Sequence, residues 1–543
     1  RGSRSIVVER CDGWQNGDAI VLSATGGEAT HYGELVSSHG WGICGVRPND
    51  GLGNGASVGT ATYTWVCGPS FSSCACRERT SDALVEIAAG SGATCESLGH
   101  RNIDVAGCRA FFDAAIAAGR DLERFEGSAE DNYWAERRTI TSVAFDGNSR
   151  CSVGLDRPLW FRHRGDWIDD VVPTQAEVVN LNRSVLITGP TIHWRDAARP
   201  ILGGQGLVTA QVGRAGSMRI EWARVERCGR IAVGQYCLHF HMVGPCPSCA
   251  FVGNVVEGGV NKGITVHGTH HSLVAQNVLY DVRGASIYIE DGNEMNNTLR
   301  ENVLICPTRS NGVDRGVGSG FDGTGYRCKL EGVPEHADSD FMEQAGIYAL
   351  SASTHFIGNR ISGHENALYV NHQGDRIWGI GGAAGRTCIM STPFGTTRGN
   401  VLHNNVGFGW YVNVAFPQRL RTDVDGYVSD FRSCLPFNLS SGADLAAPTI
   451  VEQHVEYMND FALGFYDFAD LELINFTSAL NNKGMYAKTY RRAAATGPLC
   501  TDCTFHRNAI AVQGPGGSAA VEFRRTIFSG QGSSAPTFGI NHH

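Results

Sequence analysis

The sequence has few charged residues, no long apolar run and no excess of basic residues. Of 543 residues only 18% are charged, against roughly 25% in a typical soluble domain. With 45 basic and 54 acidic residues the net charge is −9, which argues against an electrostatic nucleic-acid binder. No apolar run reaches the roughly 18 residues that span a bilayer, and the first residues carry no signal peptide. We therefore expect a soluble stretch, without a membrane span, that begins inside a longer chain.

Glycine, by contrast, is abundant, with 69 residues in 543, nearly double the usual ~7%. Together with short apolar runs, this composition favours many strands and turns over long helices. Strands are expected at residues 19–22 and 138–143, where apolar residues alternate or cluster between turns. One short amphipathic helix is expected between Cys108 and Phe125, because apolar residues recur there near helical spacing.

The chain has 18 cysteines, an even and high number that favours disulfides in an oxidising compartment. Two Cys-x-x-Cys pairs, Cys246/Cys249 and Cys500/Cys503, lack the spaced histidine pair of a zinc site, so we expect disulfides there. Asn-x-Ser/Thr sequons make four asparagines candidate glycosylation sites: Asn182, Asn296, Asn438 and Asn475. The sequence therefore predicts an extracellular or cell-surface glycoprotein.

From about residue 237 onward a short pattern recurs, a small residue followed by apolar-X-apolar. It appears at 237–240, 263–266, 286–289, 346–349, 367–370, 409–412, 464–467, 484–487 and 509–512. Most starts differ by one unit of 20–26 residues or by about two units, which is typical of the coils of a parallel β-helix.

A second element places an asparagine in each unit, several residues before the first element. These asparagines are Asn254, Asn277, Asn302, Asn359 and Asn400. In stacked turns such a side chain can take the left-handed bend and hydrogen-bond the same residue one coil away. The two elements together predict a right-handed parallel β-helix.

The repeat also aligns outward-facing side chains, because side chains alternate along a strand. One outward column is predicted to contain His239, Thr265, Tyr288, Tyr348, Tyr369, Tyr411, Tyr466 and Tyr486. The next column, two residues further on, begins with His241, His267 and Glu290 and continues through Leu350, Asn371 and Asn413. The tyrosine column is either a packing seam under a loop or a flanking domain, or, with His239, a strip that binds sugars.

Three motifs, in this order and spacing, resemble one known family: Leu238-His-Phe-His241, Thr265-Val-His-Gly-Thr269 and Ile289-Glu-Asp-Gly292, with Glu294 and Asn296 following. The chain resembles the β-helix shared by the cell-migration-inducing hyaluronidase, the transmembrane hyaluronidase, fibrocystin and fibrocystin-L. Upstream, residues 14–18, 155–159, His163 and 176–178 resemble the end of the family's eight-glycine domain. The resemblance is good over about 134–305 and faint beyond 359.

The repeat and the resemblance together predict an all-β fold, a right-handed parallel β-helix preceded by a partial β domain, and the clustered cysteines predict a disulfide-rich insertion in that domain, for which the family offers no counterpart. Residues 1–43 and 134–175 are expected to be the end of an eight-glycine-type β domain. Residues 44–133 form the cysteine-rich insertion, and residues 176–543 form the β-helix. Loop insertions in the β-helix are expected near 306–341, 373–397 and 417–447.

The family implies two kinds of function. Its hyaluronidases cleave hyaluronan and need calcium, whereas its fibrocystin branch carries similar motifs on surface proteins of cilia and stereocilia with no assigned catalysis. Glycoside cleavage needs a carboxylic acid to protonate the leaving oxygen, and Glu290, beside His241 and His267, is the candidate. Adjacent Asp291 is expected to point the other way, and either to cap the turn or to bind calcium with Asn293 and Glu294.

A second catalytic carboxylate is expected from a loop, among Asp322, Asp338, Asp340, Asp423 and Asp425. Two other hypotheses stay open for the histidines. His239, His241 and His267 can form a polar ladder with a carboxylate, or a transition-metal site, since two histidines at i and i+2 on a strand share a face.

Some features weigh against hyaluronan cleavage. The family usually has Gly-His where this chain has Gly284-Ala285, and Tyr-Pro where it has Tyr236-Cys237. Only four of the 45 basic residues are lysines, which is typical of a GC-rich genome. Such a genome points away from an animal source, and hyaluronan would then be absent. The sequence thus predicts a structural β-helix of an extracellular coat, matrix or appendage, a cilium included. Its expected partners are glycans, neighbouring surface proteins or further copies of itself, and the alternative is a calcium-dependent polysaccharide hydrolase without an organic cofactor.

Overall fold

The computed structural model describes twelve stretches of the chain, with short gaps inside them. They are residues 3–25, 62–66, 75–80, 83–86, 135–189, 207–210, 216–307, 328, 345–371, 394–415, 449–490 and 499–530, without 146–149, 158, 160–162, 166, 231–233, 352, 406, 469–470, 509 and 515–521. Within these residues every regular element is a β-strand, so the expected all-β fold is confirmed. The helix expected between Cys108 and Phe125 and most of the three loop insertions lie outside them.

The chain divides into two compact units, residues 1–164 with 308–325 and residues 165–307 with 326–543. In the first unit an antiparallel sheet pairs β1 (Ser5–Val8) with β7 (Cys151–Leu155), β7 with β6 (Glu136–Phe145), and β6 with β2 (Ala19–Leu22). A second antiparallel sheet contains β3 (Thr62–Val66), β4 (Ala75–Thr80) and β5 (Ala83–Glu86). Strands therefore form where they were expected at 19–22 and 138–143.

Buried polar contacts stabilise the first unit, in addition to its apolar core. His163 contacts the Ser23 carbonyl oxygen through Nδ1 at 2.8 Å and Glu136 Oε1 through Nε2 at 2.9 Å. Glu136 also pairs with Arg138, and both side chains are 2% exposed. A buried charge needs such partners to offset its loss of hydration, so His163, one of the residues that carry the family resemblance, has a structural role here.

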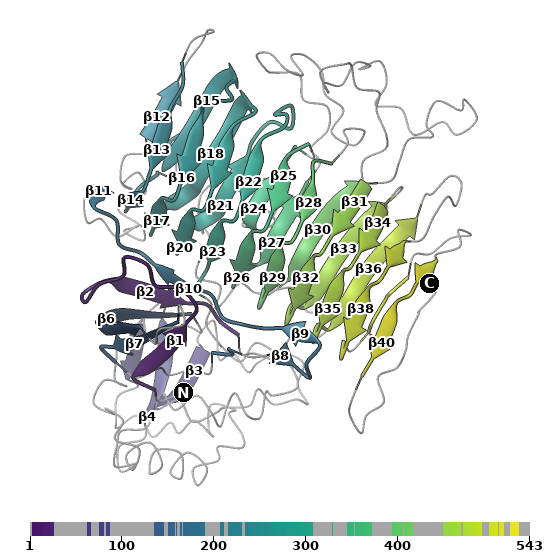
Figure 1. Cartoon of the computed structure of the whole chain (residues 1–543), viewed down its shortest axis with the longest axis horizontal. Helices are drawn as coiled ribbons and strands as arrows, with labels where there is room; N and C mark the ends of the chain where they lie inside the picture. Colours follow the sequence, from purple (N-terminus) through teal and green to yellow (C-terminus); the bar gives the residue numbers. More distant parts are fainter. Residues whose placement is uncertain are drawn as a thin grey trace. The chain divides into compact units, whose positions relative to one another are not determined.

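The second unit is a parallel β-helix whose successive coils contribute strands to three sheets, of eleven, nine and ten strands (Figure 1). The first sheet contains, in order, β11 (Val185–Thr188), β14 (Ala223–Glu226), β17 (Val255–Glu257), β20 (Val278–Tyr280), β23 (Val303–Ile305), β26 (Arg360–Ser362), β29 (Val401–His403), β32 (Val455–Tyr457), β35 (Thr477–Ala479), β38 (Thr504–His506) and β40 (Ile527–Ser529). The second contains β12 (Leu207–Ala210), β15 (Leu238–Pro245), β18 (Val260–His270), β21 (Arg283–Ile289), β24 (Ala345–Ala349), β27 (Asn366–Val370), β30 (Phe408–Ala415), β33 (Phe461–Phe468) and β36 (Lys483–Tyr490). The third contains β13 (Arg219–Glu221), β16 (Ala250–Val252), β19 (Leu273–Ala275), β22 (Thr298–Arg300), β25 (His355–Ile357), β28 (Thr397–Arg398), β31 (Thr449–Glu452), β34 (Leu471–Ile474), β37 (Cys500–Thr501) and β39 (Phe523–Arg524).

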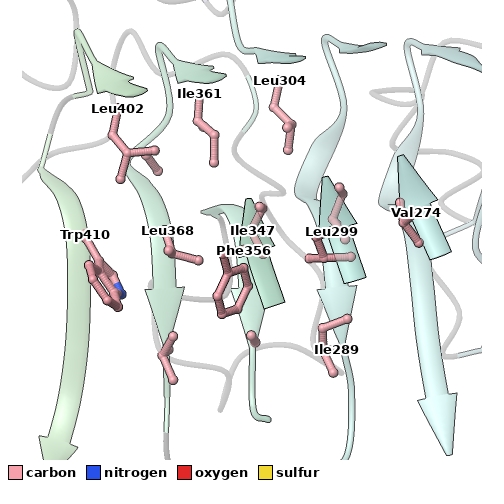
Figure 2. Close-up of a cluster of buried hydrophobic side chains, with 14 of the residues drawn as sticks. Val274, Ile289, Leu299, Leu304, Ile347, Phe356, Ile361, Leu368, Leu402 and Trp410 are labelled. Carbon is pink, nitrogen blue, oxygen red and sulfur yellow. The ribbon is translucent and has the colours of Figure 1, made fainter. Parts of the chain in front are cut away.

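The interior of the β-helix is a continuous column of apolar side chains. Figure 2 shows residues from all three sheets, such as Leu304, Phe356 and Leu368, pointing into the same space between the strands. All three are at most 1% exposed. Burying apolar surface stabilises by roughly 25 cal/mol per Å², and the repeat supplies an inward apolar residue at every coil, so the core grows with each turn.

An asparagine ladder joins successive coils at the turn between the third and the first sheet. The backbone N–H and side-chain amide of Asn254, Asn277, Asn302 and Asn359 each donate to Oδ1 of the next asparagine at 2.9–3.1 Å, ending at Asn400. The predicted contact one coil away is therefore confirmed. The left-handed bend falls elsewhere, on the preceding residue, for example Gly253, Gln276 and Glu301 with φ of 65°, 56° and 54°.

A second asparagine ladder, not predicted, runs along the turn between the first and second sheets. Asn405, Asn459 and Asn481 donate through their backbone N–H to Oδ1 of Asn459, Asn481 and Asn508, respectively, at 2.8–3.0 Å. All four side chains are at most 5% exposed. Buried amide groups need such hydrogen-bond partners. Both ladders therefore keep the turns of successive coils aligned above one another.

Residues 165–183 form a strap that lies against the first sheet of the β-helix. The strap contains β8 (Trp167–Ile168), β9 (Val172–Pro173) and β10 (Val178–Asn180). Its fully buried Val172 packs with Tyr457 and Met458. On either side of Val172, Asp169 contacts His506 and Glu177 contacts His403. The strap therefore crosses several coils and ties them together.

The ten cysteines with described side chains all form disulfides. They pair Cys11 with Cys151, Cys228 with Cys237, Cys246 with Cys249, Cys306 with Cys328 and Cys500 with Cys503. The expectation that both Cys-x-x-Cys pairs are disulfides is confirmed. Cys237, which stands where the family usually has proline, is fully buried and belongs to one of these bridges.

Candidate functional site

Three neighbouring strands, β15, β18 and β21, bring a cluster of histidines and carboxylates to one face of the β-helix. In the parallel register His239 lies opposite Thr265, and His241 lies opposite His267. The backbone N–H of Glu290 donates to the Val266 carbonyl, so Glu290 follows β21 beside His267. The sequence-predicted neighbours His241, His267 and Glu290 are thus brought together, and we call these three residues with His239 and Asp291 the His–carboxylate cluster.

His267 is the centre of this cluster. Its Nδ1 lies 3.1 Å from Nδ1 of His241 and 3.5 Å from Oε2 of Glu290, while its Nε2 lies 2.9 Å from Oδ2 of Asp291. Burial by itself would lower the pKa of His267, but the contact with Asp291 and the nearby acidic charges outweigh it and raise this pKa to about 9. In a metal-free protein His267 is therefore a cation at neutral pH.

His239 and His241 have the opposite tendency. Burial, followed by repulsion from the other two imidazoles, lowers the pKa of His239 to about 3. The pKa of partly exposed His241 is also lowered, first by burial and then by His267. Both side chains are therefore neutral near pH 7, the form in which an imidazole nitrogen can accept a proton or bind a metal ion.

Glu290 is a carboxyl group held in a poorly hydrated place. Its side chain is 15% exposed, and burial raises its pKa above the ordinary value. Tyr236 Oη lies 3.4 Å from Glu290 Oε1, and the Lys262 ammonium, 4.6 Å from the Tyr288 ring centre, adds a positive charge nearby. Sequence reasoning missed Tyr236 and Lys262 as neighbours of Glu290, although Lys262 directly precedes the small residue of its coil.

The expectation that Asp291 points away from the cluster is wrong. β21 ends at Ile289, and Gly292 has a φ of 87°, so the alternation of a regular strand no longer applies at Asp291. The turn returns the Asp291 side chain to His267. The consecutive residues Glu290 and Asp291 therefore both place a carboxylate beside the His267 imidazole.

Two of the three predicted calcium ligands have other contacts, Asp291 with His267 and Glu294 with backbone N–H groups, whereas neither side-chain polar atom of buried Asn293 has a hydrogen-bond partner among the described residues. Both oxygens of fully buried Glu294 accept backbone N–H groups, from Gly268 and Asp291 at Oε1 and from Gly292 at Oε2, at 2.7–3.0 Å. Burial raises the pKa of Glu294 to about 7 in spite of these donors. Glu294 thus shapes the turn that carries Glu290 and Asp291. Calcium binding by Asp291, Asn293 and Glu294 stays a prediction.

The tyrosine column is a buried stack, so the interpretation as a sugar-binding strip is wrong. Tyr348 and Tyr369 are fully buried, and Tyr288 and Tyr411 are 8% exposed. Neighbouring rings lie 5.1–5.5 Å apart, and the Asn371 amide donates to Tyr348 Oη at 2.7 Å. His239, also assigned to that strip, is fully buried as well. Aromatic faces already stacked on each other have no surface left for a pyranose ring.

The register of one coil also differs from the predicted one. Tyr411 pairs with Gly464, and Gly464 pairs with Tyr486, so Gly464 occupies the column position expected for Tyr466. A Cβ added at Gly464 would overlap the ring of Phe408. The glycine is therefore required by the Phe408 ring that covers it, and the apolar pattern alone does not reveal this contact.

Some of the remaining predicted glycosylation and catalytic sites lie within the described residues, and others lie outside them. Asn182 and Asn475 are exposed and Asn296 is partly exposed, so glycosylation at these sequons stays a prediction that their exposure permits. Asn438 and the candidate loop carboxylates Asp322, Asp338, Asp340, Asp423 and Asp425 lie outside the described residues. Among the described residues, no helix has the length and apolarity that a membrane crossing needs.

The fold and the cluster define a class of protein, the parallel β-helix solenoids that carry a group of histidines and carboxylates on one outer face. Residues 203–410 match the family model described as the CEMIP beta-helix. Residues 203–410 are therefore similar to the CEMIP β-helix, and the resemblance to the hyaluronidases and fibrocystins is confirmed.

The curated relatives agree. Fibrocystin-L of Mus musculus is 30% identical over 213 residues, 32% of this chain and 5% of that protein. Fibrocystin-L of Homo sapiens is 24% identical over 395 residues, 65% of this chain and 8% of that protein. The cell surface hyaluronidase CEMIP2 of Homo sapiens is 26% identical over 307 residues, 52% of this chain and 21% of that protein. The chain thus spans less than a quarter of the length of each of these relatives.

Proposed function

We propose that this chain is part of an extracellular or cell-surface protein whose β-helix is a structural element of a coat, matrix or appendage. Its partners are neighbouring surface proteins, glycans or further copies of itself. The observation that carries the proposal is the burial of the tyrosine column. Side chains that could have formed a binding strip are used for stacking coil on coil.

Two further observations support an extracellular location. Among the residues with described side chains, all ten cysteines are paired, and disulfides persist in oxidising compartments. One relative is named as a cell surface protein. A ciliary location rests on the resemblance to the fibrocystins alone and belongs to the same proposal.

Self-association would use the end of the β-helix. Val185 and Leu186 on β11, the outermost strand of the first sheet, are 55% and 53% exposed. An exposed apolar strand at a sheet edge is a template for pairing with another chain. Sedimentation of the whole chain over a hundredfold concentration range should show oligomers that the double variant Val185→Lys, Leu186→Lys abolishes. A monomer at every concentration, together with no binding to a glycan array, would contradict the structural proposal.

A second candidate, glycoside hydrolysis, is favoured by Glu290. A partly exposed carboxyl whose pKa is raised by burial is suited to protonate a leaving oxygen, and Asp291 across His267 would be the second carboxylate. Calcium, in this candidate, would bind at the turn of Asp291, Asn293 and Glu294 and order it.

The two candidates separate in one assay. Reducing ends released from acidic and neutral polysaccharides would be measured with calcium and with a chelator, for the unaltered chain, Glu290→Gln and the exposed control Glu221→Gln. Cleavage that Glu290→Gln abolishes and Glu221→Gln retains supports the hydrolase. No cleavage of any polysaccharide by folded protein excludes it and leaves the structural role.

A further inference from the structure

The His–carboxylate cluster contains a set of atoms spaced like the ligands of a metal ion. One nitrogen from each of His239, His241 and His267 can be chosen so that all three lie within 4.8 Å of one another. His241 Nδ1 and His267 Nδ1 are 3.1 Å apart. Glu290 Oε2 lies 3.5 Å from His267 Nδ1 and 4.0 Å from His239 Nε2.

These separations approach those of a tetrahedral site. Zinc binds imidazole nitrogen and carboxylate oxygen at about 2.0–2.2 Å, which places the ligand atoms of a tetrahedron about 3.3 Å from one another. Three of the separations, at 3.1, 3.5 and 4.0 Å, are within about 0.7 Å of that value. The three histidine nitrogens lie up to 4.8 Å from one another, so side-chain rotations would have to close gaps of at most about 1.5 Å to reach the tetrahedral spacing. The strands of three successive coils thus hold four ligands around one point.

We propose that His239, His241, His267 and Glu290 bind a divalent transition-metal ion of the zinc type. Nitrogen-rich donor sets select such ions, whereas calcium takes six to eight oxygen ligands. Asp291 does not bind the metal in this arrangement. It holds Nε2 of His267 so that Nδ1 faces the ion, the carboxylate–histidine–metal arrangement that orients ligands in known sites.

An independent observation is that polar atoms of His239 and Glu290 lack well-aligned hydrogen-bond partners. Neither ring nitrogen of His239, nor Oε2 of Glu290, has a well-aligned hydrogen-bond partner among the described residues. The nearest groups are the Gly234 backbone beside the His239 ring and His267 Nδ1 at 3.5 Å from Glu290 Oε2, and the His239 side chain is 1% exposed. Leaving a buried polar group unpaired costs about 1–3 kcal/mol. A metal ion at the common point would satisfy both groups at once.

A proton is the competing explanation for some of these contacts. Doubly protonated His267 can donate to Asp291 through Nε2 and to His241 through Nδ1 without any metal. That arrangement gives Glu290 Oε2 only the 3.5 Å charge contact with His267 and gives the ring nitrogens of His239 no well-aligned partner, so it accounts for fewer of the contacts. The metal proposal does not depend on the structural or hydrolase proposals, and with Glu290 bound to the ion this residue is no longer free to act as an acid.

The first test uses the unaltered full chain, produced without a histidine tag and freed of metal by dialysis against a chelator. Diethylpyrocarbonate, which modifies accessible imidazole nitrogens, would be applied with and without one equivalent of zinc chloride, and modified peptides quantified by mass spectrometry. We expect zinc to reduce modification of His241 at least tenfold and to leave His271, on the neighbouring turn, unchanged. Equal modification of His241 with and without zinc would overturn the proposal.

The second test measures binding directly. Titration calorimetry should show one zinc ion bound per chain, with affinity lowered at least a hundredfold in His241→Ala and about tenfold to a hundredfold in Asp291→Asn. The control His271→Asn keeps a residue that tolerates the left-handed backbone at this position, where φ is 63°, and should bind as the unaltered chain does. Unchanged zinc affinity in folded His241→Ala would overturn the proposal. If that variant does not fold, the diethylpyrocarbonate modification of the unaltered chain, with and without zinc, decides whether the site binds metal.

Discussion

Oε2 of Glu177 lies 2.9 Å from Nε2 of His403, which is 226 residues further along the chain. Oε1 of the same carboxylate lies 3.1 Å from the Arg360 guanidinium. Glu177 therefore joins β26 and β29 through the strap of residues 165–183. At the other end of that strap Asp169 Oδ2 lies 3.0 Å from His506 Nε2 and 3.3 Å from Arg507.

Glu177→Ala should destabilise the β-helix by about 2–3 kcal/mol, because it leaves Nε2 of the buried His403 side chain without its partner. Urea denaturation measures the loss, and hydrogen exchange should show faster exchange in residues 167–181. The comparison variant Glu221→Gln removes one partner of the exposed Arg219–Glu221 pair and should cost under about 1 kcal/mol. Equal stability of the two variants would show that the strap does not hold the coils.

Asn302→Ala should also be costly, since Asn302 is a middle rung of the first asparagine ladder. Its Oδ1 accepts two hydrogen bonds from Asn277, and its amide donates to Asn359 and to the Val274 carbonyl. Leaving these buried groups unpaired is expected to lower the free energy of unfolding by about 2–4 kcal/mol. The exposed Asn182→Ala is the matched control, and similar small losses in both variants would contradict a stabilising ladder.

Gly464→Ala tests the register of the tyrosine column. The added methyl group would overlap the Phe408 ring, and overpacking of this kind costs about 1–3 kcal/mol. Gly165→Ala, where an added Cβ has no neighbour within 4 Å, should be nearly neutral. Adding Phe408→Leu to Gly464→Ala should restore part of the loss, and thermal unfolding of the three variants would show whether it does.

Acid should destabilise the β-helix through His364. Burial alone lowers the pKa of this fully buried side chain to about 3, against 6.5 for a free imidazole. The unfolded chain therefore binds a proton between these values when the folded chain does not, so the free energy of unfolding is unaffected above about pH 6.5 and falls as the pH drops toward 3.

His364→Gln should remove its share of that fall, about 3 kcal/mol between pH 7 and pH 4. Urea denaturation at several pH values gives the slope for the unaltered chain and the variant. His355→Gln, at a partly exposed side chain whose pKa burial also lowers, should change the slope less. Parallel slopes for the unaltered chain and His364→Gln would refute the assignment.

The repeat of small-apolar-X-apolar elements determined the β-helix from sequence, because every coil must place the same kind of side chain inward. The same argument placed His241, His267 and Glu290 side by side, and the recurring asparagine predicted a ladder. Such features follow from strand alternation and parallel stacking, which need only the positions of residues in the sequence. The Cys-x-x-Cys disulfides were likewise determined by spacing, since three residues of separation bring the sulfurs within reach.

Only the tertiary structure decided what happens where the periodicity ends. Asp291 faces His267 because a glycine turn breaks the strand alternation, and Gly464 replaces Tyr466 in its column because Phe408 covers that position. The burial of Tyr348 and Tyr369, and the contact between Glu177 and His403, depend on groups distant in sequence. A local pattern records which side of a strand a residue occupies, whereas what covers that side is determined by packing between distant segments.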